Sequence, residues 1–215
     1  MTYRVILLKL LSKAFESDFL DGNLYLNTNA YFGVIDHTDS VRFDPYDGID
    51  ESRHGVSVDI QDEAKVWLPL PIVGPFTVRV GGSTTLNVLC LFTVTDRSSD
   101  SFDSRNFAFG EVAVVIDNLT EFIRRVKRSA ADANKKVHLG PIQYVERETH
   151  DGPMGPFRKF AEHSYQNEFR FVLTNGSGTA CRLAIGDIRD IAHSISTTEI
   201  PLFWQEMLGL DADQA

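Results

Sequence analysis

The sequence predicts an α+β fold, with a single domain over residues 1–208 and a flexible tail over residues 209–215. We expect a bent, mixed or antiparallel sheet flanked by three or four helices. Most strand-like segments are short and do not alternate regularly with helices, as they would in a doubly wound parallel sheet. The glycine-rich loops G-x-G-x-x-G and G-x-x-x-x-G-K-[ST], which hold nucleotide phosphates, are absent from the sequence.

The first part of the chain predicts a strand, a short helix and a second strand. Aliphatic residues dominate 3–10 (YRVILLKL), which is typical of a buried strand. Ser12 can cap a helix that Gly22 ends, because glycine commonly stops helices. Alternating leucines in NLYLNTNAYFG (23–33) then indicate a strand that leads into a turn.

The middle of the chain predicts an acidic loop and several strands. Asp-Pro and Asp-Gly pairs in 34–52 favour turns. The short strands expected next, which a β-meander would fit, are 55–60, 64–70 and 76–80. The very apolar segment 86–94 (LNVLCLFTV) predicts a central strand that is covered on both faces.

The second half predicts the clearest helix of the chain, which begins after another apolar strand at 111–116. Asn118 and Glu121 have the spacing of a capping box, and the helix extends to about residue 136. The elements expected after it are a strand (137–146), a loop (149–156), a short helix (157–167), a strand (168–173), a hairpin turn (175–179) and a strand (181–185).

Composition excludes some classes of partner. The net charge is −9 with scattered acidic residues, which disfavours tight non-specific binding to nucleic acid. The basic run 124–128 is interpreted as the solvated face of the helix. Cys90 and Cys181 lie in apolar segments far from each other, so we expect buried free thiols in a reducing compartment. No segment approaches about 18 consecutive apolar residues, so we expect a cytoplasmic protein without a membrane partner.

Common catalytic and metal-binding motifs are also missing. The histidines are isolated, and the acidic loop DPYDGIDE (44–51) does not match the EF-hand pattern, so no metal is expected. Ser177 lacks the first half of G-x-S-x-G, and neither cysteine lies in an electropositive loop.

The segment YQNEFR (165–170) leaves two interpretations open. Gln166, Glu168 and Arg170 have period-two spacing, so in a strand their side chains would share one face. The simple interpretation is an edge or half-exposed strand with a surface ion pair between Glu168 and Arg170. The other is that Glu168 is a catalytic carboxylate.

Several segments taken together resemble a family of bacterial and phage proteins of unknown function. They include FLDGNLYLNTNAYF, RFDPYDG and PFRKFAEHSYQNEFRFVL, and the resemblance extends from about Phe19 to Ile188. The pattern is also similar, more distantly, to ADP-ribosyltransferase-like domains. That resemblance implies that Glu168 is the key acid and that Gln166 belongs to a Q-x-E arrangement.

The same resemblance implies a cofactor site for NAD. Arg4 would contact NAD, and Thr28 or Tyr31 would support the nicotinamide ribose. We expect Arg4 or Arg42 to share a pocket with Glu168. The usual Ser-Thr-Ser element is missing from LNTNAYF, and residues 54–84 have no counterpart in those domains.

Two hypotheses of function follow. The first is an NAD-dependent transferase that modifies a macromolecular target in bacterial or phage conflict. The alternative is a non-enzymatic acidic protein of phage or bacterial origin that binds and inhibits a host factor. In the alternative, Asp44 and Asp47 of the acidic loop would engage a basic partner.

Overall fold

An antiparallel sheet of eight strands forms the centre of the computed structural model, which describes residues 5–35, 41–72, 74–95 and 102–208. Its strands are β1 (Val5–Leu11), β2 (Asn23–Thr28), β7 (Asn87–Thr95), β8 (Val112–Ile116), β9 (Val137–Pro141), β13 (Glu168–Leu173), β14 (Cys181–Ala184) and β15 (Ala192–Ser196). The strand order is β14-β2-β7-β1-β8-β15, and β13 pairs with both β7 and β9. The expected central strand is therefore confirmed, because β7 pairs with β1, β2 and β13.

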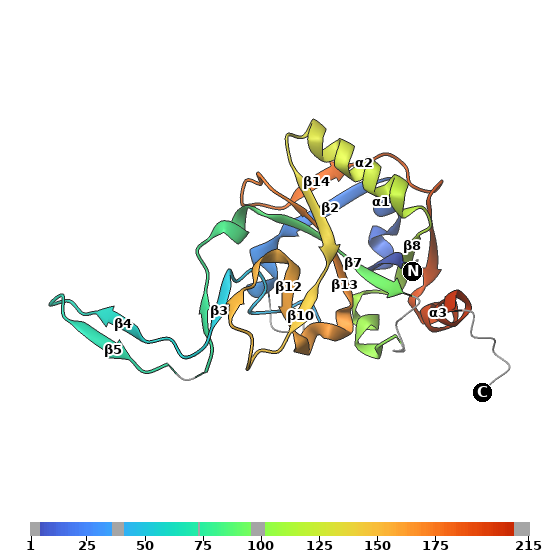
Figure 1. Ribbon diagram of the computed structural model, residues 1–215. Coiled ribbons are helices and arrows are strands. Elements are labelled where there is room, and N and C mark those ends of the chain that lie inside the picture. Colours follow the sequence, from blue (N-terminus) through green and yellow to red (C-terminus); the bar gives the residue numbers. More distant parts are fainter. Residues whose placement is uncertain (1–4, 36–40, 73, 96–101, 209–215) are drawn as a thin grey trace.

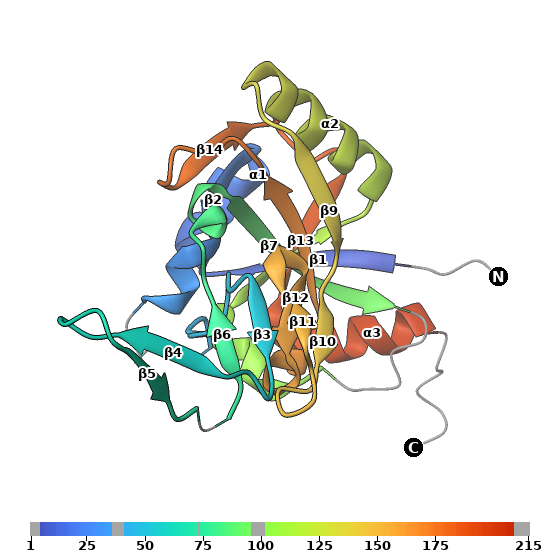
Figure 2. The same cartoon turned by 60° about the vertical axis from the view of Figure 1, so that its left-hand side comes forward.

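Helices cover both faces of this sheet (Figures 1 and 2). The α-helices are α1 (Glu16–Leu20), α2 (Leu119–Asp132) and α3 (Ile200–Leu208). Apolar side chains alternate along β1, so Leu7 and Leu11 pack in one core with α2, whereas Leu8 and Leu10 pack in another with α3. These helices and antiparallel sheets confirm the α+β class. No helix in the described ranges is both long and apolar enough to cross a bilayer.

The helix α2 begins as expected. The side chain of Asn118 accepts a hydrogen bond from the backbone N–H of Glu121 (3.1 Å), which satisfies one of the free donors at the helix start. The Glu121 carboxylate does not complete the capping box, because it accepts hydrogen bonds from Arg124 and Arg125 instead.

One edge of β7 is shared by two strands. Val88 and Asn87 pair with the end of β2, whereas residues from Phe92 to Thr95 pair with β1. Between these two registers β1 and β2 separate, and the edge of β7 at Leu89, Cys90 and Leu91 faces the resulting fork. This fork gives the sheet an opening beside its central strand.

Smaller strands surround the main sheet, and several differ from the expectation. They are β3 (Glu51–Arg53), β4 (Val58–Gln61), β5 (Trp67–Leu70), β6 (Phe76–Val78), β10 (Gln143–Val145), β11 (Gly152–Pro153) and β12 (Arg158–Phe160). The expected meander is wrong, because β6 pairs with β3 and not with β5. The expected hairpin at 175–179 is also wrong, since β14 pairs with β2 and not with β13.

The short helix expected over residues 157–167 is likewise wrong. Residues 158–160 form β12, which pairs in parallel with β10, and a 3-10 helix (Ala161–Gln166) follows. Pairing with β10 therefore overrides the local helical pattern at these residues. The tail expected over residues 209–215 lies outside the described residues.

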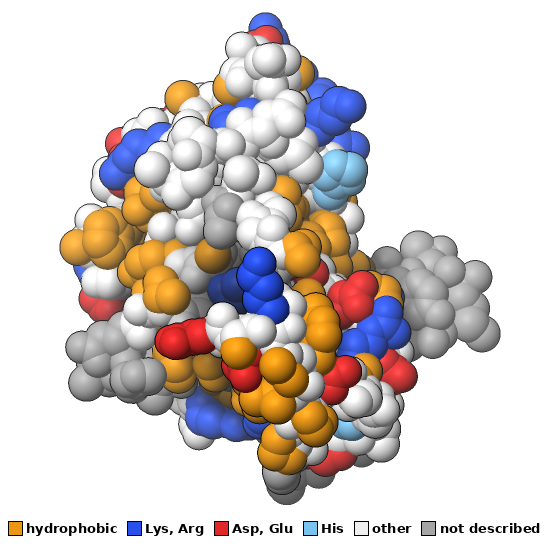
Figure 3. All heavy atoms as spheres, turned by 90° about the vertical axis from the view of Figure 1, so that its left-hand side faces the viewer, with side chains coloured by type: hydrophobic (Ala, Val, Ile, Leu, Met, Phe, Trp, Pro, Cys, Tyr) orange, Lys and Arg blue, Asp and Glu red, His pale blue; other side chains and the backbone are white. Residues whose placement is uncertain are grey.

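The hairpin of β4 and β5, which we call the arm (residues 58–70), projects from the body of the molecule (Figure 1). Figure 3 views the molecule from the side to which the arm projects and shows hydrophobic side chains gathered on that face. On one of its faces Val58 lies opposite Leu70, and Ile60 lies opposite Leu68. Ile60, Leu68 and Leu70 are 40–48% exposed, and Trp67 is 65% exposed. The arm thus presents an apolar face that the described residues do not cover.

Gly22, in the turn between α1 and β2, offers a test of its packing against the segment that follows β14. Its φ is +80°, and an added Cβ would lie 1.9 Å from the carbonyl oxygen of Gly186. Gly55 also has a positive φ (+62°), but a Cβ there would meet nothing within 4 Å. We expect Gly22→Ala to lower the free energy of unfolding by at least about 2 kcal/mol more than Gly55→Ala, measured by urea denaturation. Equal losses would show that the close approach is not tight.

Candidate functional site

A cavity of about 700 Å³ opens at the fork between β1 and β2. Aromatic rings line part of it, including those of Tyr25, Tyr31 and Phe109. The cationic side chains that line it are Lys9, Arg42, Lys159, Arg170 and Arg182, and the acidic ones are Asp18, Asp47 and Glu168. In a chain with a net charge of −9, this lining holds more cations than carboxylates.

Arg170, on β13, lies at the floor of the cavity and is 0% exposed. Its guanidinium donates to both carboxylate oxygens of Asp47 (2.9 and 2.6 Å) and to both of Glu168 (2.8 and 3.2 Å). It also donates to Asn29 Oδ1 (3.1 Å) and to the carbonyl of Pro156 (3.0 Å). The planar fork of donors is thus fully used, which is the geometry that makes arginine suited to buried carboxylate pairs.

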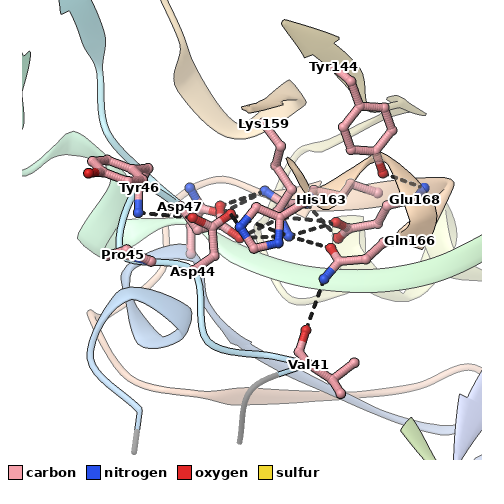
Figure 4. A network of polar contacts seen from close by, with 12 residues as sticks. Val41, Asp44, Pro45, Tyr46, Asp47, Tyr144, Lys159, His163, Gln166 and Glu168 are labelled. Carbon is pink, nitrogen blue, oxygen red and sulfur yellow. Dashed lines mark hydrogen bonds and ion pairs between the residues drawn. The ribbon is translucent and has the colours of Figure 1, made fainter. Parts of the chain in front are cut away.

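Lys159 is the second buried cation of the floor. Its ammonium lies 3.2 Å from Glu168, 3.6 Å from Asp47 and 3.7 Å from Asp44. It also donates to Gln166 Oε1 (2.7 Å), and Gln166 in turn donates to the carbonyl of Val41 (2.9 Å). Figure 4 shows these side chains converging from β12, β13 and the acidic loop.

The ion pairs decide which groups are charged. Burial alone would raise the pKa of Glu168, but the positive charges of Arg170 and Lys159 outweigh it and hold that pKa well below its usual range. For Lys159, burial opposes the charge, but Glu168 and Asp47 raise its pKa above the ordinary value. Glu168 is therefore a carboxylate and Lys159 an ammonium at neutral pH.

His163 lies at the edge of this network, with Nε2 3.5 Å from Asp44. Burial lowers the pKa of His163, and the nearby charge of Asp44 only partly opposes this effect. Its Nδ1 is buried without a hydrogen-bond partner among the described residues. The imidazole is thus neutral at pH 7, and it adds no positive charge to the floor.

The structure brings together four of the residues predicted from the sequence. Glu168, Gln166, Tyr31 and Arg42 line the same cavity. Thr28, which ends β2 opposite Asn87, is not among the lining residues.

Arg4, the first-strand arginine expected to contact NAD, lies outside the described residues.

The surface interpretation of YQNEFR is wrong. The strand β13 is not an edge strand, because it lies between β7 and β9. Glu168 and Arg170 do share one face, but they are only 6% and 0% exposed. Gln166 precedes the strand, at the end of a 3-10 helix, and reaches the same network through Lys159.

The acidic loop also differs from its expected role. Asp44 and Asp47 are each 1% exposed, so their carboxylates are not available to a basic partner on the surface. In the described part of the chain, no group of three or more His, Cys, Asp or Glu side chains is placed to hold a metal ion.

Sequence reasoning missed Lys9 and Lys159 as site residues. Lys9 is the single charged residue in the apolar segment VILLKLL, and Lys159 stands next to Phe160, a core residue. A lone charge inside an apolar strand is unusual unless it has a partner or a function, and this signal was present in the sequence.

Comparison with protein-family models, with curated proteins and with solved structures finds no match to this chain.

Removal of Arg170 tests the network. We expect Arg170→Met to lower the free energy of unfolding at pH 7 by about 3–5 kcal/mol, because it leaves Asp47 and Glu168 buried without their main cation. In the intact protein the low pKa of Glu168 stabilises the fold above the ordinary value of about 4.3, and this contribution is lost as the pH falls through and below it. The variant lacks most of that contribution. The difference between the two proteins should therefore narrow as the pH falls through and below about 4.3.

Arg189→Met is the matched control, since Arg189 forms ion pairs with Asp21 and Asp187 at the surface. Urea denaturation of each variant at several pH values provides the measurement. A loss for Arg170→Met no greater than that of the control would contradict the structural role of the network.

Proposed function

We propose that the chain binds NAD in the cavity and cleaves its nicotinamide–ribose bond, with Glu168 as the carboxylate that stabilises the transition state. One observation carries this proposal: an ionised, immobilised Glu168 lies at the floor of a cavity whose lining is rich in cations and aromatic rings. The proposal also agrees with the distant resemblance to ADP-ribosyltransferase-like domains.

The required chemistry is electrostatic. Departure of nicotinamide builds positive charge on the ribose, and a carboxylate fixed beforehand stabilises that charge without reorganisation. Glu168 is fixed by Arg170 through two hydrogen bonds and by the ammonium of Lys159.

The remaining lining suits a dinucleotide. Arginine side chains bind phosphate oxygens, and Arg42 and Arg182 both line the cavity. Aromatic rings such as that of Tyr31, which is 41% exposed, offer stacking surfaces to a base. Because the sequence has no glycine-rich phosphate loop, side chains take the role that backbone N–H groups have in parallel folds.

Gln166 has a positioning role in this proposal. Its amide oxygen accepts from Lys159 and its amide nitrogen donates to Val41, so both ends of the side chain are used within the protein. We propose that it holds Lys159 against Glu168. By the resemblance alone, the acceptor of the ADP-ribose would be a macromolecule in bacterial or phage conflict.

The test of this function is NAD cleavage by the purified protein. We expect nicotinamide release, measured by chromatography, to fall about 10²–10³-fold in Glu168→Gln, which keeps the shape of the side chain but removes its charge. Glu63→Gln, an exposed position on the arm, is the matched control and should keep full activity. Circular dichroism and thermal melting report whether each variant folds. Full activity of a folded Glu168→Gln, or no thermal shift of the intact protein with NAD, would refute the assignment.

A second candidate function, binding of a protein partner without chemistry, is favoured by the arm. Exposed apolar faces of this kind mark interaction sites, and an isolated two-stranded hairpin gains stability when it is covered. Acidic residues Asp59, Asp62 and Glu63 outnumber Lys65 on the arm. We therefore propose a partner with an apolar surface rimmed by lysine and arginine, since a second copy of the chain would present the same negative charge.

Site-specific crosslinking tests this candidate. A photoreactive benzoylphenylalanine in place of Leu70, which lies on the same face as Ile60 and Leu68, should give a heterologous crosslink in a bacterial extract. We expect the crosslink to vanish when the apolar face carries Ile60→Asp and Leu68→Asp, and to persist with Glu168→Gln. A crosslink only between two copies of the chain, or one unaffected by the two aspartates, would exclude this partner.

A further inference from the structure

Lys9 occupies the fork of the sheet. It lies on β1, is half-buried and lines the cavity. Its ammonium donates to the carbonyl of Cys90 (3.0 Å), on the β7 edge that β1 and β2 leave open. Lys9 is therefore the one charged side chain that β1 contributes to the lining, beside Leu10 and Leu11.

The two lysines of the cavity have opposite surroundings. Lys159 lies within 4 Å of three carboxylates, whereas no carboxylate of the described residues lies within ion-pair distance of Lys9. Burial lowers the pKa of Lys9, Cys90 and Glu168 oppose this effect, and the charge of Arg42 adds to it. Burial also raises the pKa of the Cys90 thiol to about 12, so this neighbour is uncharged at pH 7 and offers the ammonium no counter-charge.

We propose that Lys9 is a nucleophile that forms an imine with an anionic aldehyde bound in the cavity. A lysine that lacks a carboxylate partner in an apolar, partly closed site exposes a neutral amine more often than a surface lysine does. The arginines of the lining, Arg42 and Arg182, favour an aldehyde that carries a phosphate or carboxylate.

The reaction balances without a further reactant. The nitrogen lone pair of the neutral amine attacks the carbonyl carbon, and the carbonyl π bond becomes a hydroxyl group after proton transfer from nitrogen. Loss of this hydroxyl with the second amine proton as water forms the C=N bond. The inference goes beyond NAD cleavage and does not depend on it, because neither Glu168 nor a dinucleotide takes part.

Pyridoxal 5′-phosphate, an aromatic aldehyde with a phosphate group, is the probe. The intact protein is incubated with it at pH 7, the imine is reduced with borohydride to a stable secondary amine, and the modified lysines are mapped by mass spectrometry. We expect Lys9 to be modified at least ten times faster than the exposed Lys65 and Lys127. Pyridoxal without the phosphate should react with Lys9 at least several-fold more slowly.

Lys9→Arg is the control variant, because arginine keeps the positive charge and a donor for the Cys90 carbonyl but forms no imine. It should fold, by circular dichroism, and lose the fast phase of modification. Modification of Lys9 no faster than that of Lys65, or a fast phase that survives in a folded Lys9→Arg, would overturn the inference. Neither result bears on nicotinamide release, so failure of one proposal leaves the other standing.

Discussion

The buried guanidinium of Arg170 is the constraint on which the rest of the site depends. It joins segments that are far apart in the sequence, since Asn29 and Asp47 lie 141 and 123 residues before it. Through Asp47 it fixes the acidic loop, and through the carbonyl of Pro156 it fixes the approach to β12. Because a buried charge without its partner is so costly, the cavity wall cannot move far without breaking the fold. The floor is therefore rigid before any ligand binds.

The fork in the sheet explains why the cavity lies where it does. A strand whose edge is fully paired leaves no room beside it, but β7 has two partners on one edge and a gap between them. The open carbonyl of Cys90 needs a donor, and Lys9 supplies it. The same break in pairing thus produces both the space for a ligand and a lysine with few counter-charges. The different surroundings of the two cavity lysines follow from topology and not from their local sequence.

Sequence patterns predicted those parts of the fold that depend on residues close together in the chain. The periodicity of α2, the Asn118 cap and the apolar run of β7 each depend on neighbouring residues, and each was predictable. Period-two spacing also placed Glu168 and Arg170 on one face. Burial of that face was not predictable, because it results from β7 and β9 on either side. Likewise, Asp44 and Asp47 have the sequence of a surface turn, and only cations more than 100 residues away draw them inside.

The ionisation of Glu168 limits the chemistry that it can support. A carboxyl group whose pKa lies below its usual range holds no proton at neutral pH, so Glu168 cannot serve as a general acid there. Arg170 donates to both carboxylate oxygens of Glu168, and Lys159 lies close to Oε2. If either oxygen moved toward a substrate carbon as a nucleophile, these contacts would break. Stabilisation of a developing positive charge requires neither a proton nor movement. Arg170 and Lys159 weaken the electric field of the Glu168 carboxylate while they fix its direction. A substrate must therefore place its reacting carbon close to the floor of the cavity for the carboxylate to stabilise it.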